Sequence, residues 1–189
     1  CASQSGNSIG LPPAVQSCPP PVDLPELALP IADAQVNEWE TVAAAGGTHS
    51  SPCPYVISDG AVSLGPKKIN CDLTIQNDAV VTLNGPLWVV GNLDVKNTAQ
   101  LKLSAGYGNR DEVVIADNPA NRTTSSKISI QNSSQILGSG AATSYLVLLS
   151  QNNSAEIGGS EAAIAPKNSA SAAVYYAGHG KILIENNVE

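Results

Sequence analysis

The hydrophobic and polar positions of this chain follow two different periods, one before about residue 53 and one after it. In the first part, the segment ADAQVNEWETVAAAGG places Val36 and Trp39 on one helical face, with Asp33 as a candidate N-cap and Gly46-Gly47 as a stop. This pattern predicts one helix over about 33–45. In the second part, apolar and polar residues alternate in short runs, as in β-strands that bury one face.

The strand-forming part of the chain is repetitive. The segments GPKKINCDLTI (65–75) and GPLWVVGNLDV (85–95) align without a gap when Gly65 is placed on Gly85. A pattern of the form apolar–x–apolar–x–Asn, with one Asp in the place of Asn, recurs along the chain at a short interval or at nearly twice that interval. Strands at this spacing, joined by short turns, are typical of the coils of a β-solenoid. The last residues of the repeated pattern are Asp59, Asn77, Asn97, Asn132, Asn168 and Asn186.

We therefore expect an all-β fold, a right-handed parallel β-helix of about six coils. The Asn at each coil turn tolerates a left-handed conformation, and it can bond the equivalent Asn of the next coil as a ladder. Insertions at about 104–126 and 150–162 are expected to enlarge two coils on one side. The N-terminal end of the solenoid exposes an apolar cross-section, and we expect the helix to cap it through Val36 and Trp39.

The first thirty residues differ from the rest because they hold more than half of the prolines, including the run Pro19-Pro20-Pro21. Proline fixes φ and lacks an N–H donor, so residues 1–30 are predicted to form an extended arm. The helix-capped solenoid domain then covers residues 31–189.

The four cysteines indicate an oxidising compartment. Cys53 and Cys71 are separated by the same interval as the successive turn positions Asp59 and Asn77, so they should face each other on adjacent coils and form a disulfide. Cys1 and Cys18 are the remaining pair. In an alternative interpretation, Cys1 is the lipid-carrying first residue of a bacterial lipoprotein. Both interpretations predict an exported protein, extracellular or at the cell surface.

Composition excludes several classes of function. The formal charge is 9 − 16 = −7, and the chain has no basic run, which argues against nucleic-acid binding. No stretch of the sequence is apolar enough to span a membrane. Phe and Met are absent, so the core must consist of Val, Ile, Leu and Ala.

Two histidines and one acidic segment are the candidates for catalysis or metal binding. Gly178-His179-Gly180 looks like the histidine motif of polygalacturonase-type hydrolases, but the paired carboxylates that such sites need are missing from the neighbouring turns. His179 is therefore interpreted as a turn residue, and His49, which has no second ligand at metal spacing, as a loop residue. The acidic segment offers oxygen ligands for Ca²⁺, but charges that flank an exposed strand are ordinary; its residues are Asp111, Glu112, Asp117 and Asn118. We expect no catalytic residue, metal or cofactor.

One insertion loop carries a candidate contact surface. Tyr107, Asn109 and Arg110 combine an aromatic ring, an amide and a cation, which suits contact with a surface glycan or with a partner protein such as a host-cell receptor. The alternative, a loop that is simply solvated, is the more ordinary interpretation of such residues.

Several stretches resemble the β-helical domain of bacterial pilus-assembly proteins of the PilX N-terminal type, found in candidate-phylum bacteria. They are LPIADAQVNEWETVAAAGGT (29–48), LGPKKINCDLTI, LNGPLWVVGNLDVKN and SYLVLLS. The resemblance covers roughly residues 29–188. It implies a surface protein associated with type IV pili.

Together these features favour a non-enzymatic extracellular structural protein, a pilus-associated or filament-forming subunit or adhesin. The last segment, KILIENNVE, continues the repeat without a capping element, which predicts end-to-end self-association or contact with other pilus subunits. The alternative is a carbohydrate-active β-helix enzyme that acts on extracellular polysaccharide.

Overall fold

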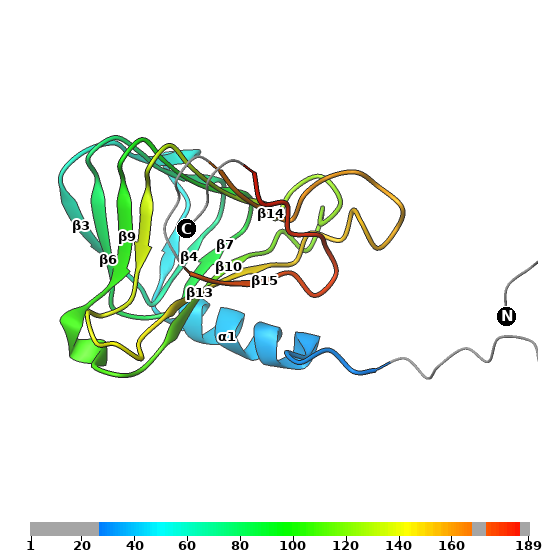
Figure 1. The fold of residues 1–189 in the computed structure, drawn as a ribbon, viewed down its shortest axis with the longest axis horizontal. Helices are drawn as coiled ribbons and strands as arrows, with labels where there is room; N and C mark the ends of the chain where they lie inside the picture. The colour runs from blue at the N-terminus through cyan, green and yellow to red at the C-terminus, as the bar shows by residue number, and fades with distance from the viewer. Residues whose placement is uncertain (1–26, 168–172, 186–189) are drawn as a thin grey trace, which may run out of the picture. The chain divides into compact units, whose positions relative to one another are not determined.

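The computed structural model describes residues 27–167 and 173–185 (Figure 1). The chain divides into two units, residues 1–30 and 31–189, and the architecture below is that of the second. The predicted arm, except for residues 27–30, and the predicted Cys1–Cys18 pair lie outside the described residues.

Three parallel sheets and one helix make up the described part of the second unit. Sheet A contains, in spatial order, β1 (Thr48–His49), β4 (Lys67–Ile69), β7 (Leu87–Val89), β10 (Glu112–Ala116), β13 (Leu146–Ser150) and β15 (Val174–Tyr176). Sheet B contains β2 (Tyr55–Ile57), β5 (Leu73–Ile75), β8 (Leu93–Lys96), β11 (Ile128–Gln131) and β14 (Ile164–Pro166). Sheet C contains β3 (Ala61–Leu64), β6 (Val80–Leu83), β9 (Gln100–Leu103) and β12 (Gln135–Leu137).

The chain visits sheets A, B and C in turn and then returns to sheet A, so neighbouring strands of each sheet are three strands apart in sequence over most of the fold. This order is consistent with the expected parallel β-helix, and Figure 1 shows strands β3, β6 and β9 of one sheet side by side. The right-handed winding and the number of coils stay predictions.

The strand register confirms the sequence repeat. Leu73 pairs with Leu93, and Val81 pairs with Leu101, both at the shift that places Gly65 on Gly85. The longer intervals follow the same register, because Leu93 pairs with Ile128 and Ile128 pairs with Ile164. The extra residues of these two coils lie in loops outside the ladder, among them 117–127 and 151–163. Both predicted insertions are found, but their extra residues lie at both ends of β10 and of β13, in 104–111 with 117–127 and in 138–145 with 151–163, and not on one side of the coils.

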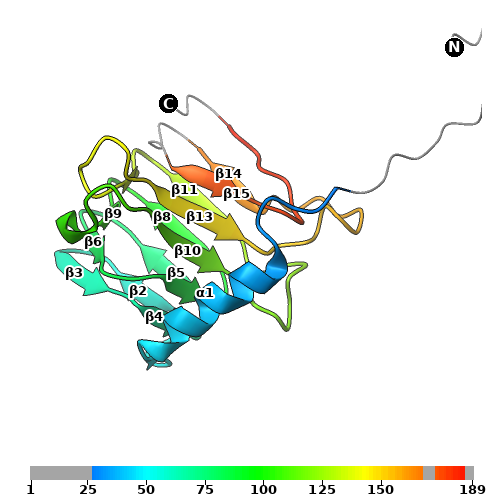
Figure 2. The ribbon, with the colours of Figure 1, turned by 90° about the horizontal axis from the view of Figure 1, so that it is seen from below.

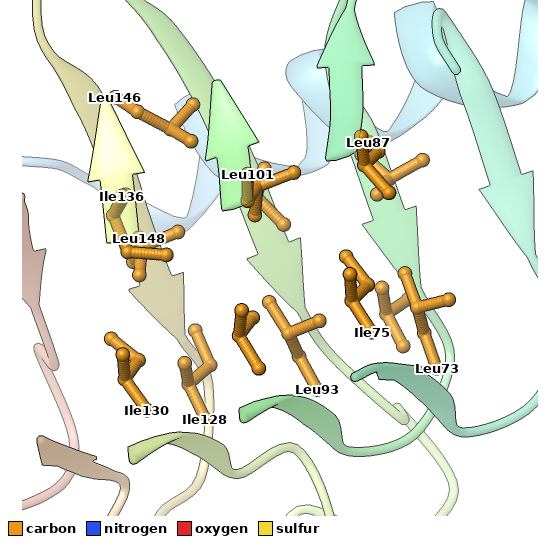
Figure 3. Packing of buried hydrophobic residues seen from close by; sticks show 14 of the residues in the cluster. Leu73, Ile75, Leu87, Leu93, Leu101, Ile128, Ile130, Ile136, Leu146 and Leu148 are labelled. Atoms are coloured by element: carbon orange, nitrogen blue, oxygen red, sulfur yellow. The ribbon is translucent and has the colours of Figure 1, made fainter. Parts of the chain in front are cut away.

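The inward side chains form a core of aliphatic residues stacked in rows along the sheets (Figure 3). Leu73, Leu93 and Ile128 lie at equivalent positions of sheet B, and all three are buried. Their outward neighbours Thr74 and Asp94 are partly exposed. This alternation confirms the strand assignment made from the period of two.

The coil turns confirm the left-handed asparagines at three positions. Asn77, Asn97 and Asn132 have φ of 57°, 56° and 58°. The Nδ2 of Asn132 donates a hydrogen bond to the Oδ1 of Asn97 at 3.0 Å, which is one step of the predicted ladder. Between Asn77 and the next coil the hydroxyl of Thr98 takes this role, donating to the Asn77 carbonyl at 3.2 Å. Asn168 and Asn186 lie outside the described residues.

The prediction was wrong at Asp59. In the first coil the positive φ, 78°, belongs to Gly60. Ile57 pairs with Ile75 and Ala61 pairs with Val80, so the first turn is one residue shorter than the next. The shorter turn reverses at its glycine, which adopts a positive φ without steric cost.

The disulfide between Cys53 and Cys71 is present, with a Cα–Cα distance of 5.9 Å. It joins the segments that lead into β2 and β5, which are neighbours in sheet B. The prediction from equal spacing is confirmed.

Helix α1 (Asp33–Ala45) has the predicted bounds, and Gly46 is its C-cap. Its N-cap is Ala32, and no side chain caps the helix, so the assignment of Asp33 as the capping residue was wrong. Asp33 is instead the first helical residue, and its carboxylate bonds residues far along the chain. No helix among the described residues is long and apolar enough to cross a membrane.

The position of helix α1 differs from the expected cap. Val36 packs against Val113, Ile115 and Leu149, and Trp39 packs against the same cluster. These partners are outward residues of β10 and β13, so the helix lies on the outer face of sheet A and contacts β4, β7 and β10 (Figure 2). The reason is that the middle strands of sheet A are apolar on both faces, and their outer face needs a cover.

We expect a loss of stability when the stacked core is truncated in sheet B. Leu93→Ala should lower the free energy of unfolding by about 2–5 kcal/mol, because the flanking coils hold the cavity open. Chemical denaturation with far-UV circular dichroism measures the loss. Thr74→Ala, on the outward side of the neighbouring strand, is the control and should change stability by less than about 0.5 kcal/mol. Equal effects of the two substitutions would contradict the inward packing of Leu93.

Candidate functional site: titratable groups around the helix

His179 is held between two carboxylates from distant parts of the chain. Its Nε2 lies 3.0 Å from Oδ1 of Asp33 in helix α1, and its Nδ1 lies 3.1 Å from Oε2 of Glu156 in the loop between β13 and β14. The imidazole is mostly buried, with 20% of its side chain exposed. We call Asp33, Glu156 and His179 the histidine clasp.

Ion pairing shifts the titration of the clasp. The hydrogen bond to Asp33 raises the pKa of His179 above its ordinary value of 6.5, and the bond to Glu156 adds to this effect. The same bond to His179 lowers the pKa of Asp33. The amide of Gln151, at the end of β13, also donates to Asp33 Oδ1 at 3.3 Å. The clasp therefore ties the start of the helix to the loop after β13 and to the bend after β15.

A second group of charges lies where β10 ends. Asp117 has a fully buried side chain and accepts two hydrogen bonds from the guanidinium of Arg122, at 2.8 and 2.7 Å. The bonds to Asp117 raise the pKa of Arg122. The Asp117 carbonyl accepts a hydrogen bond from the indole of Trp88 at 2.9 Å. This two-point pairing satisfies a carboxylate that would otherwise be costly to bury.

Glu40, in the middle of helix α1, faces the same place. Only 6% of its surface is exposed, and its Oε1 has no hydrogen-bond partner among the described residues. Burial raises the pKa of Glu40 to about 8, and the charge and hydrogen bonding of the adjacent Asp117 contribute to this rise. Glu40 is therefore largely protonated at neutral pH. We call Glu40, Asp117 and Arg122 the acid cluster.

Sequence reasoning missed both groups for physical reasons. The partners of His179 lie 23 and 146 residues away, so no local motif joins them. Glu40 carried a usable signal, because it follows Val36 by four residues and so shares the buried face of the helix. The interpretation of His179 as a simple turn residue captured its position between two glycines but not its ion pairs.

Chemically, both groups hold a proton beside carboxylates, the acid cluster in a buried place and the histidine clasp with its two carboxylates about half exposed. Among the described residues, no group of His, Cys, Asp and Glu is arranged to hold a metal ion. The oxygens considered for Ca²⁺ are directed to other partners. Asp111 accepts the backbone N–H of Tyr145 at 2.7 Å, Glu112 accepts the Tyr107 hydroxyl at 2.6 Å, and Asp117 holds Arg122.

The candidate contact loop is only partly available to a partner. Tyr107 packs against the core, and burial followed by the bond to Glu112 raises the pKa of its hydroxyl. The guanidinium of Arg110 lies 5.5 Å from the centre of the Tyr107 ring. Asn109 and Arg110 are exposed. Next to this loop, an open groove of about 590 Å³ crosses the outer face of sheet C; its lining includes Thr82, Lys102, Ser104, Leu137 and Ser139.

His49, the other histidine, lies at the start of the solenoid. Its ring stacks on Tyr55, with centroids 3.9 Å apart, and its Nε2 lies 2.9 Å from the carbonyl oxygen of Pro52. The structure therefore gives His49 a packing role.

No model of a known protein family matches the chain, and no curated protein or solved structure is detectably similar to it. The resemblance to pilus-assembly proteins therefore stays a prediction.

The acid cluster predicts a large effect of removing its cation. Arg122→Met should lower the free energy of unfolding by about 2–4 kcal/mol, because the buried Asp117 loses its partner next to Glu40. The matched control is Lys127→Met. Lys127 is as exposed as Arg122, but its partner Glu161 is on the surface, where water and salt screen the pair, so its removal should have a much smaller effect. Denaturant unfolding of both variants at neutral pH measures the difference. Similar losses in the two variants would contradict a buried role for the Asp117–Arg122 pair.

Proposed function

We propose that this protein is a non-enzymatic structural protein of the cell exterior, a pilus-associated or filament-forming surface subunit. The observation that carries the proposal is the apolar character of the last described segments. Ile182, Leu183 and Ile184 are 40%, 40% and 63% exposed. They are exposed although this segment adds a further step to the solenoid, in which Ile182 pairs with the first residue of β14 and Glu185 pairs with the residue after β14. Val174, on the outermost strand of sheet A, is 45% exposed.

A partner that continues the solenoid would cover these side chains. Every sheet is parallel, so its two edges differ and the contact between copies would be head to tail. Contacts of this kind extend into a filament unless the rotation between copies closes a ring. Another pilus subunit with a matching edge would use the same surface.

Two further features support a place outside the cell. The Cys53–Cys71 disulfide needs an oxidising compartment to persist. Charged residues make up 13% of the chain, and its surface is solvated mainly by neutral polar residues. For an adhesin, the exposed Asn109 and Arg110 beside the groove on sheet C are the candidate contacts with a surface glycan or a host-cell receptor.

The proposal is tested by the assembly state of the purified protein at high concentration. We expect fibres by electron microscopy and large species by sedimentation velocity. Ile184→Lys should abolish them, because a charge at the end contact is costly to bury. Ile157→Lys is the matched control, since Ile157 is the same residue type with the same exposure of 63% but lies in the loop after β13. Monomers at every concentration, or equal disruption by both variants, would contradict end-to-end assembly.

One observation favours the enzymatic alternative, a carbohydrate-active β-helix enzyme. His179 has two carboxylate neighbours, Asp33 and Glu156, which do not lie on the neighbouring coil turns where the sequence was searched for them. Against this, both carboxylates are occupied by the same imidazole. Assay of pectins and related polysaccharides decides between the two proposals: turnover that is lost in His179→Ala would favour the enzyme and overturn the structural proposal.

A further inference from the structure

Helix α1 covers an apolar strip on the outer face of sheet A. Val36 is buried there, and Trp39 of the helix and Trp88 of β7 pack around the same cluster. Beside this apolar contact, the helix meets the sheet through ionisable groups, Asp33 at its first turn and Glu40 in its middle. Both ionisable contacts depend on a proton.

The contact in the middle of the helix is the acid cluster. Glu40 faces Asp117 and Arg122 from the loop after β10 and Lys68 from β4. The ammonium of Lys68 lies 4.0 Å from the centre of the Trp88 ring. With Glu40 protonated, the buried Asp117 and Arg122 balance each other in charge. Once Glu40 ionises, a second carboxylate lies beside Asp117 in a place of low water access, and this is repulsive.

The contact at the start of the helix is the histidine clasp. Asp33 faces His179 and Gln151, with Arg122 close enough to affect its charge, while His179 faces Asp33 and Glu156. The protonated imidazole attracts both carboxylates. A neutral imidazole can donate only one hydrogen bond, so one of the two carboxylates then loses its donor.

The two contacts respond to pH in the same direction. The pKa of Glu40 is raised from 4.5 to about 8, so the folded state loses stability as pH rises from about 4.5 to about 8. The pKa of His179 is also raised, so its stabilisation is full below 6.5 and is lost as pH rises through the higher folded value. The disulfide and the stacked core contain no group that titrates in this range.

We propose that helix α1 is a pH-dependent cover of sheet A, closed while Glu40 and His179 carry protons and opened in mildly alkaline solution. Opening exposes the apolar strip formed by Val113, Ile115 and Leu149. The solenoid itself stays folded, because its ladder and core do not involve these protons.

The chain carries its own reporters for this motion. Its two tryptophans, Trp39 and Trp88, lie on the two sides of the contact. We expect the tryptophan emission maximum to move to longer wavelength between about pH 6 and about pH 9, where ordinary tyrosines are still mostly protonated. The far-UV circular dichroism signal of the strands should not change over the same range.

Two pairs of variants test the assignment. Glu40→Gln cannot ionise, so the transition should disappear or its midpoint should rise by about one pH unit or more. Its control, Glu38→Gln, alters an exposed residue of the same helix and should titrate like the wild type. His179→Gln removes the clasp at every pH and should open the cover at lower pH, whereas His49→Gln should not.

Three results would overturn the proposal. The first is a wild-type emission maximum that does not move over this pH range. The second is a transition in which the strand signal is lost together with the emission shift, since this is global unfolding. The third is a transition whose midpoint is the same in Glu40→Gln and His179→Gln as in their controls. If Glu40→Gln does not fold, the His179→Gln and His49→Gln pair still decides.

Discussion

The structure depends on one constraint: each strand must place its residues directly beside the equivalent residues of the previous coil. The register of sheet B shows this most clearly, where Leu73, Leu93 and Ile128 follow each other at one position. A side chain that fits one coil must fit next to its copy about 4.8 Å away, which favours compact aliphatic residues and explains a core without phenylalanine. The same constraint acts at the corners. A Cβ on Gly65 would collide with the Gly85 carbonyl of the next coil, so the repeated Gly-Pro reflects close backbone stacking.

This constraint also decides what the sequence could predict. A stacked register repeats the sequence pattern, so the alignment of the two Gly-Pro segments located the strand pairs, and the equal spacing of Cys53 and Cys71 located the disulfide. The bounds of helix α1 followed from its period and its glycine stop. Features that do not repeat were harder to predict from the sequence. The first turn is one residue short, so Asp59 did not take the conformation of Asn77.

The position of the helix and the titratable groups around it depend on contacts between distant segments. Asp33 meets His179 across 146 residues, which no repeat or motif encodes. The position of the helix did leave a sequence signal, because β10 and β13 are apolar at consecutive positions rather than at alternate ones. Both faces of these strands therefore had to be covered, and the helix is the covering element. Glu40 lies in that contact because it follows Val36 by one helical turn, and burial, followed by the adjacent Asp117, raises its pKa.

The lateral position of the helix bears on how the protein meets its partners. A helix that lies across β4, β7 and β10 cannot also cap the first coil. The element that was expected to cover the N-terminal end of the solenoid therefore covers the outer face of sheet A. The described part of the last coil likewise carries exposed aliphatic side chains where a capped solenoid would carry polar ones. Under the proposed end-to-end assembly, the stacking constraint within the chain would also apply between copies, and the exposed aliphatic side chains of the last described segment would be covered. The proposed assembly therefore asks of the contact between copies the same register that the core already requires between coils.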